Sequence, residues 1–107
     1  MPKYQHTKAN VAKLAMTLHA WHNSQRVGNR PWLTQKEIAK IADIRTKESD
    51  ELALSTVNRL MEPIFGKKPM DAYRNLAEAD DGRRKLLSVL QDAIDRYGKF
   101  YLGDDDE

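Results

Sequence analysis

The 107-residue sequence predicts an all-α protein, a small bundle of about five helices. Apolar residues recur at intervals of three and four along several segments, which is the period of an amphipathic helix. No segment alternates apolar and polar residues as a half-buried strand does, so no β-hairpin or wing is expected. The length suits a single domain over residues 1–103, followed by a mobile acidic tail over residues 104–107.

The first predicted helix runs from about residue 7 to residue 25 and has one apolar face. Its apolar residues follow each other at spacings of three, four and three: Val11, Leu14, Leu18 and Trp21. His19 and His22 are three residues apart and can share a face, but no third ligand accompanies them. We therefore predict no metal site.

A loop follows the first helix and ends at an aromatic residue. Gly28 and Pro31 interrupt the helical pattern, and Trp32 stands with Arg26 and Arg30. A basic loop with an aromatic ring can contact a sugar–phosphate backbone. An aromatic residue just before a helix more commonly packs on the core as a hydrophobic staple, and we favour this interpretation for Trp32.

The second predicted helix begins at a capping signal. Thr34 is a suitable N-cap, and Glu37 follows three residues later, which matches the capping box. The residues after the cap place an apolar stripe on one side of the helix: Ile38, Ala39, Ile41, Ala42 and Ile44.

The third predicted helix covers about residues 54–62. Leu54, Val57 and Met61 form its apolar stripe, and the polar residues lie largely off it. Pro63 is expected to end this helix, because proline removes a backbone donor and restricts the preceding residue. The next segment, residues 64–69, is predicted as a turn.

The segment TQKEIAKIADI, followed by STVNRL, resembles the helix-turn-helix of bacterial transcription regulators. The resemblance implies a small residue where the two helices touch (Ala39), an apolar residue at the turn (Ile44), and a recognition helix that opens with Ser-Thr-Val. The sequence departs from the family in the turn, which usually has about three residues. Either the turn is long, over residues 45–54, or the recognition helix begins near Ser49. In the second case it includes the carboxylates of Asp50 and Glu51, which would repel DNA phosphates.

Two further helices are expected, over residues 70–79 and 83–100, with Asp80 or Asp81 capping the second. The last helix carries a long apolar stripe that can cover the core or form a homodimer. As dimer contacts we predict the following residues: Leu86, Leu90, Ile94, Tyr97 and Tyr101.

Charge is distributed unevenly along the chain. Residues 1–47 carry nine Lys or Arg and two Asp or Glu, whereas residues 48–107 carry nine and fourteen. A basic half beside an acidic half is typical of a nucleic-acid binder, although an unevenly charged solvated surface is the simpler alternative. The acidic tail can serve solubility or screen the basic face.

Several classes of function lack their signatures in this sequence. There is no cysteine, no glycine-rich phosphate loop and no nucleophile elbow, so we expect neither an enzyme nor a cofactor. No apolar run approaches the roughly 20 residues of a membrane span, and the amino-terminal residues lack the apolar region of a secretory signal. These features favour a cytoplasmic protein.

These observations predict a sequence-specific binder of double-stranded DNA, a small transcriptional or plasmid/phage maintenance regulator. On the recognition helix that opens at Ser55, the expected base-reading residues are Thr56, Asn58 and Arg59. Phosphate contacts are expected from these residues: Lys36, Arg45, Lys47, Arg30, Lys67 and Lys68. The alternative is a small adaptor or inhibitor that binds a host protein through its basic helical face.

Overall fold

The computed structural model describes residues 3–24, 31–44 and 54–101. Within these ranges it contains five α-helices and no strand, which confirms the predicted all-α fold. The predictions for Arg30, Arg45, Lys47 and the acidic tail lie outside the described residues. The helices have the following bounds: α1 Lys3–Ser24, α2 Gln35–Ala42, α3 Leu54–Phe65, α4 Pro69–Glu78 and α5 Gly82–Tyr101.

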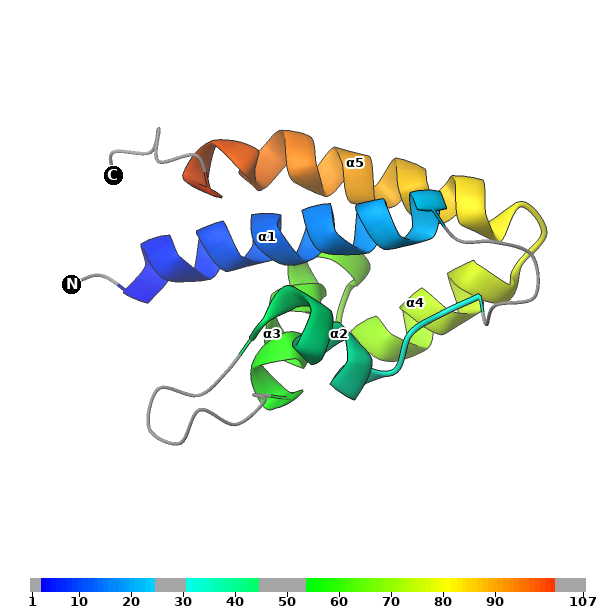
Figure 1. Ribbon diagram of the computed structural model, residues 1–107, viewed down its shortest axis with the longest axis horizontal. Helices are drawn as coiled ribbons and strands as arrows, with labels where there is room; N and C mark the ends of the chain where they lie inside the picture. Colours follow the sequence, from blue (N-terminus) through cyan, green and yellow to red (C-terminus); the bar gives the residue numbers. More distant parts are fainter. Residues whose placement is uncertain (1–2, 25–30, 45–53, 102–107) are drawn as a thin grey trace.

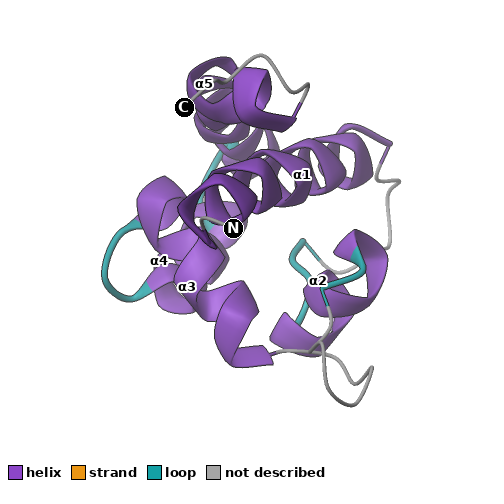
Figure 2. Ribbon diagram, turned by 90° about the vertical axis from the view of Figure 1, so that its left-hand side faces the viewer, coloured by secondary structure: helices purple, strands orange, loops and turns teal. Residues whose placement is uncertain are grey.

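Helix α1 is the centre of the bundle. The long helices α1 and α5 lie side by side and antiparallel (Figure 1, Figure 2). Helices α2 and α3 pack on α1, and α4 packs against α3 and α5. All five helices contribute to one core, because apolar side chains from each are fully buried in it. The largest of them include Leu14, Leu18, Ile38, Met61, Tyr73, Leu86 and Leu90.

The apolar stripe of α5 packs inside the chain. Leu86 and Leu90 have no exposed surface, and Ile94 and Tyr97 are half-buried against the same core. Only Tyr101 of the predicted dimer residues is exposed, at 49%. The dimer prediction therefore needs correction for Leu86 and Leu90: the core of the same chain already covers them.

Helix α2 begins as its sequence predicts. The Thr34 hydroxyl accepts a hydrogen bond from the Glu37 N–H, and the Glu37 carboxylate accepts one from the Thr34 N–H, which completes the capping box. At the other end Asp43 adopts a left-handed conformation with φ 56°, and the Ile44 N–H reaches back to the Ala39 carbonyl at 2.9 Å. Ile44 is thereby turned into the core.

Helix α3 continues past Pro63 to Phe65, so the predicted end at this proline is wrong. Proline cannot donate to the Arg59 carbonyl, but the next turn restores the pattern, because the Gly66 N–H donates to the Glu62 carbonyl at 2.8 Å. Pro63 is exposed, so water can solvate the carbonyl that loses its donor. One missing bond so near the end of a helix is tolerated.

The corner between α4 and α5 requires a glycine. A Cβ atom on Gly82 would overlap the carbonyl oxygens of Leu76 and Ala77 in α4. The Gly82 N–H also donates to the Ala79 carbonyl at 2.9 Å. Close approach of the two backbones therefore fixes the angle at which α5 leaves α4 and returns along α1.

Candidate nucleic-acid interface

Helix α3 presents a polar side to solvent. Val57, Leu60 and Met61 are buried, so the opposite side is outward. At about 100° per residue, four polar side chains share an outward arc of roughly 100°: Ser55, Asn58, Arg59 and Glu62. Thr56 is half-buried and lies on the other flank of the core-facing stripe from Asn58. The predicted base-reading residues thus do not all share one face.

A shallow depression of about 500 Å³ opens beside the first turn of α3. It lies where the start of α2, the start of α3 and the turn between α3 and α4 meet. Eight residues line it: Gln35, Ser55, Asn58, Lys67, Lys68, Pro69, Met70 and Asp71. Four of these, Ser55, Asn58, Lys67 and Lys68, are DNA-contact residues that the sequence predicts.

Gln35 joins α2 to α3 at this depression. Its side-chain amide donates to the Leu54 carbonyl, so the first residue of α2 holds the first residue of α3. The sequence analysis did not assign Gln35 to the site. Its position directly after the Thr34 cap was visible, but its contact depends on how α3 packs against α2, which periodicity along one helix does not reveal.

The charge of the depression is mixed. Lys67 and Lys68 are exposed, and within the described residues neither forms an ion pair with a carboxylate. Asp71 stands in the first turn of α4, where the helix dipole favours a negative charge. The two lysines attract an anion such as phosphate, whereas the negative charge of Asp71 repels it.

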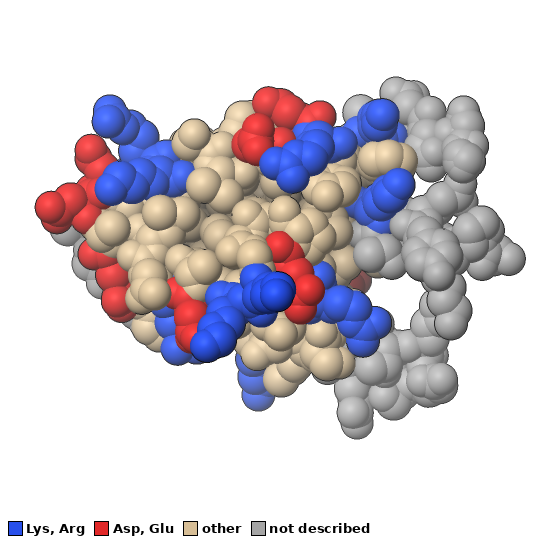
Figure 3. Space-filling view, turned by 180° about the vertical axis from the view of Figure 1, so that it is seen from behind, with Lys and Arg blue, Asp and Glu red and all other residues tan. Residues whose placement is uncertain are grey.

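The remaining predicted residues lie around this depression or outside it. Lys36 is exposed on α2, one residue after Gln35, and Arg59 is exposed on α3, but neither lines the depression. In the view from behind (Figure 3), basic side chains on the described surface stand close to acidic ones. The face seen in Figure 3 therefore carries both signs of charge, as the lining of the depression does with Lys67, Lys68 and Asp71.

Behind the depression, a buried polar cluster holds the segment that leads into α2. His22 is fully buried, and its Nε2 shares a hydrogen bond of 2.9 Å with the Tyr73 hydroxyl. The same hydroxyl accepts the Leu33 N–H at 2.9 Å. At the end of α1 the Arg83 Nε donates to the His22 carbonyl at 2.8 Å. The cluster ties together α1, α4, α5 and the start of α2.

The burial of His22 was not predicted from the sequence, where its spacing from His19 was considered only as a possible metal site. The signal was present, since His22 follows Leu18 by four residues and so continues the apolar stripe of α1. His19 is half-exposed, whereas His22 faces Tyr73. The two imidazoles therefore have different environments.

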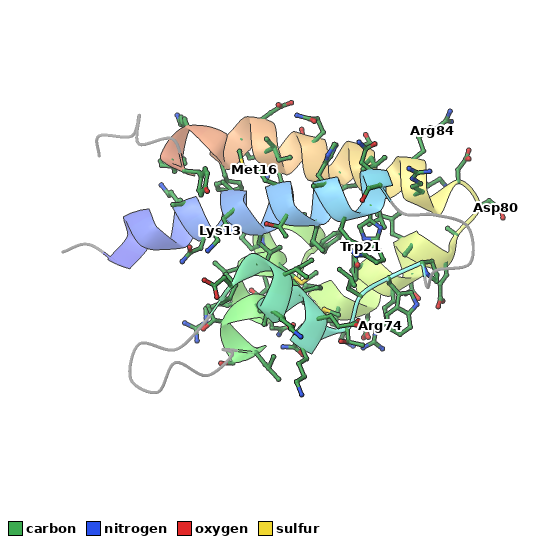
Figure 4. The ribbon with its side chains drawn as sticks, in the orientation of Figure 1. Lys13, Met16, Trp21, Arg74, Asp80 and Arg84 are labelled. Atoms are coloured by element: carbon green, nitrogen blue, oxygen red, sulfur yellow. The ribbon has the colours of Figure 1, made fainter. Side chains whose placement is uncertain are left out.

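Trp32 packs on the core, as expected, but against α4. Its Nε1 donates to the Glu78 carboxylate at 2.8 Å, and the Arg74 guanidinium lies 5.0 Å from the ring centroid. Arg74, labelled in Figure 4, projects from α4 beside the segment that leads into α2. Leu33, the residue directly before the cap, is more deeply buried than Trp32, with 5% of its surface exposed. Trp32 thus fixes the entry to α2 from the side of α4.

Within the described residues, no helix is both long enough and apolar enough to cross a membrane. No protein-family model matches the sequence, and neither the curated proteins nor the solved structures compared with it give a match.

Proposed function

We propose that the protein binds double-stranded DNA through the depression and the outward side of α3, as a small transcriptional or plasmid/phage maintenance regulator. One observation carries this proposal. Ser55 and Asn58 in α3 and Lys67 and Lys68 in the following turn, expected as DNA contacts from the sequence, line the same depression. Polar groups that hydrogen-bond to base edges and cations that neutralise phosphates are the two components of a DNA interface.

The dimensions of α3 suit this role. Its twelve residues span about 18 Å, and the major groove of B-DNA, roughly 12 Å wide, admits one helix. In this arrangement the Asn58 amide can pair with adenine and the Arg59 guanidinium with guanine. Lys67 and Lys68 lie just beyond the end of α3 and would contact the phosphates that border the groove.

The proposal is tested by fluorescence anisotropy with random-sequence duplex DNA, over a salt series from about 50 to 200 mM. We expect the logarithm of the affinity to fall linearly with the logarithm of the salt concentration. Lys67→Gln/Lys68→Gln should make the slope shallower by about two, because each phosphate contact contributes about 0.9.

A matched control removes two cations elsewhere on the surface. Arg84→Gln/Lys85→Gln changes exposed residues in the first turn of α5, outside the lining of the depression, and should leave the slope unchanged. If the wild-type protein does not bind duplex DNA even at the lowest salt concentration, the proposal is refuted.

A second candidate, an adaptor that binds a host protein, is favoured by the acidic residues of the same surface. Asp71 lines the depression and Glu62 lies on the outward side of α3, where both would repel phosphate but could pair with a cationic partner. Arg59→Ala separates the two functions. It should weaken DNA binding by about 1–3 kcal/mol and relax specificity at one base pair. A cationic partner that pairs with Asp71 and Glu62 should not lose affinity, because the substitution removes a like charge.

A further inference from the structure

A second cluster of cations lies at the end of the molecule where α1 begins and α5 ends. The Phe100 ring, half-buried in the last turn of α5, has the Lys8 ammonium 4.7 Å and the Lys99 ammonium 5.3 Å from its centroid. Both lysines are exposed, and Tyr101 beside them is 49% exposed. Because both distances are measured to one ring, the two ammonium nitrogens are no more than about 10 Å apart.

The two ammonium groups lack carboxylate partners among the described residues. Neither Lys8 nor Lys99 has a described Asp or Glu within ion-pair distance. Arg96 provides the contrast on the same helix: it also lies over an aromatic ring, that of Tyr97, but it donates to the Asp92 carboxylate at 2.6 Å. The charge of Arg96 is therefore compensated locally, whereas no carboxylate of the described ranges compensates those of Lys8 and Lys99.

The helix dipole explains why a cation is favourable at Lys99 but not why one is found at Lys8. Lys99 stands in the last turn of α5, where the dipole favours a cation. Lys8 has no such advantage, because it lies in the amino-terminal part of α1. The aromatic ring brings a cation from each helix to one place, which restricts their side chains before any ligand binds.

This cluster and α3 are on the same end of the molecule. The views in Figure 1 and Figure 2 agree that the carboxyl-terminal part of α5 and the amino-terminal part of α1 lie above α3 at that end. The molecule measures 43 × 30 × 25 Å along its principal axes. Its smaller dimensions, 30 and 25 Å, are shorter than one turn of B-DNA, about 34–36 Å.

We propose that Lys8 and Lys99, arranged around Phe100, form a second phosphate contact that grips the duplex outside the depression. This inference rests on the proposed DNA-binding function. The contact recognises backbone phosphate and not base edges, so it adds to affinity and to its salt dependence and leaves sequence preference unchanged.

The test compares the salt dependence of duplex binding for three double variants. Lys8→Gln/Lys99→Gln should make the logarithmic slope shallower by about two, with the order of preference among sequences unchanged. Lys8→Arg/Lys99→Arg retains both charges and should keep the wild-type slope. Arg84→Gln/Lys85→Gln removes two cations at the opposite end of α5, where Figure 4 labels Arg84, and should also keep it. Thermal unfolding of each variant verifies that the fold is intact.

The outcomes distinguish this inference from the function on which it rests. If the wild type binds no duplex, the proposed function fails and the inference with it. If the wild type binds and Lys67→Gln/Lys68→Gln lowers the slope while Lys8→Gln/Lys99→Gln does not, only this inference is overturned. Inorganic phosphate at constant ionic strength provides a further arm. If phosphate weakens duplex binding by the wild type more than by Lys8→Gln/Lys99→Gln, the pair holds backbone phosphate as proposed. If it weakens both equally, the pair does not contact the duplex and this inference is overturned.

Discussion

Tyr73 is the residue through which three parts of the chain meet. Its ring is fully buried, and its hydroxyl contacts the His22 ring and the Leu33 N–H. A buried polar group without its hydrogen bonds is costly, so two contacts to one hydroxyl make this atom a strong determinant of stability. Because Leu33 precedes the cap of α2, the hydroxyl also fixes where α2 begins, and with it one wall of the depression.

Tyr73→Phe removes this hydroxyl and keeps the ring. We expect the free energy of unfolding to fall by about 1–3 kcal/mol, since two buried groups lose their hydrogen bond to it. The measurement is urea denaturation followed by circular dichroism. Tyr101→Phe, which removes a hydroxyl from an exposed ring, serves as the control and should change stability by less than about 0.5 kcal/mol. Equal midpoints for the two variants would contradict the role assigned to Tyr73.

At the scale of elements, the residues at the helix termini determine where each helix begins and ends. The capping box of α2 and most of the stripes of α2 and α5 were predictable, because each depends on residues close together in the sequence. The exceptions are Ile41 of the predicted α2 stripe, which is 40% exposed, and Tyr101 of the α5 stripe, which is 49% exposed. The end of α3 was not predicted correctly. The prediction considered only the hydrogen bond that Pro63 cannot donate. The helix continues because the next hydrogen bonds still form, including the one from the Gly66 N–H, one residue beyond Phe65, to the Glu62 carbonyl.

The two glycines of α5 give opposite predictions for the same substitution. Gly82→Ala should destabilise the protein by about 1–3 kcal/mol, because the added methyl overlaps two carbonyl oxygens of α4. Gly98→Ala should stabilise it by about 0.5–1 kcal/mol, because its Cβ would meet only the Ile94 side chain at 3.9 Å and alanine favours a helix. Denaturant midpoints measure both effects. A stabilising Gly82→Ala would show that α4 and α5 do not approach so closely.

At the scale of the whole molecule, tertiary packing assembles the candidate surface. Ser55 and Asn58 were predictable because they lie off the apolar stripe of α3. Gln35 and Asp71 were not, because they reach the depression only through the packing of α2 and α4 around α3. From the sequence, the apolar stripe of α5 could pack either in the core or in a dimer interface. The packing of α1 against α5 shows that Leu86 and Leu90 belong to the core.

A second depression, of about 630 Å³, can be compared with the first by the charges that line it. It lies between the end of α3 and the outward side of α5, and Asp92 and Asp95 are among its lining residues. Its charged lining is more acidic than that of the first depression, since Arg96 is the only cation among its described lining residues and already donates to Asp92. A duplex should therefore approach the first depression and avoid the second.

The most direct measurement is a titration of the ¹⁵N-labelled protein with duplex DNA, followed through its amide chemical shifts. The proposed function predicts the largest changes at Ser55, Asn58, Lys67 and Lys68, and small changes at Asp92 and Asp95. Changes concentrated on the outward side of α5, or none at a DNA excess in low salt, would contradict it.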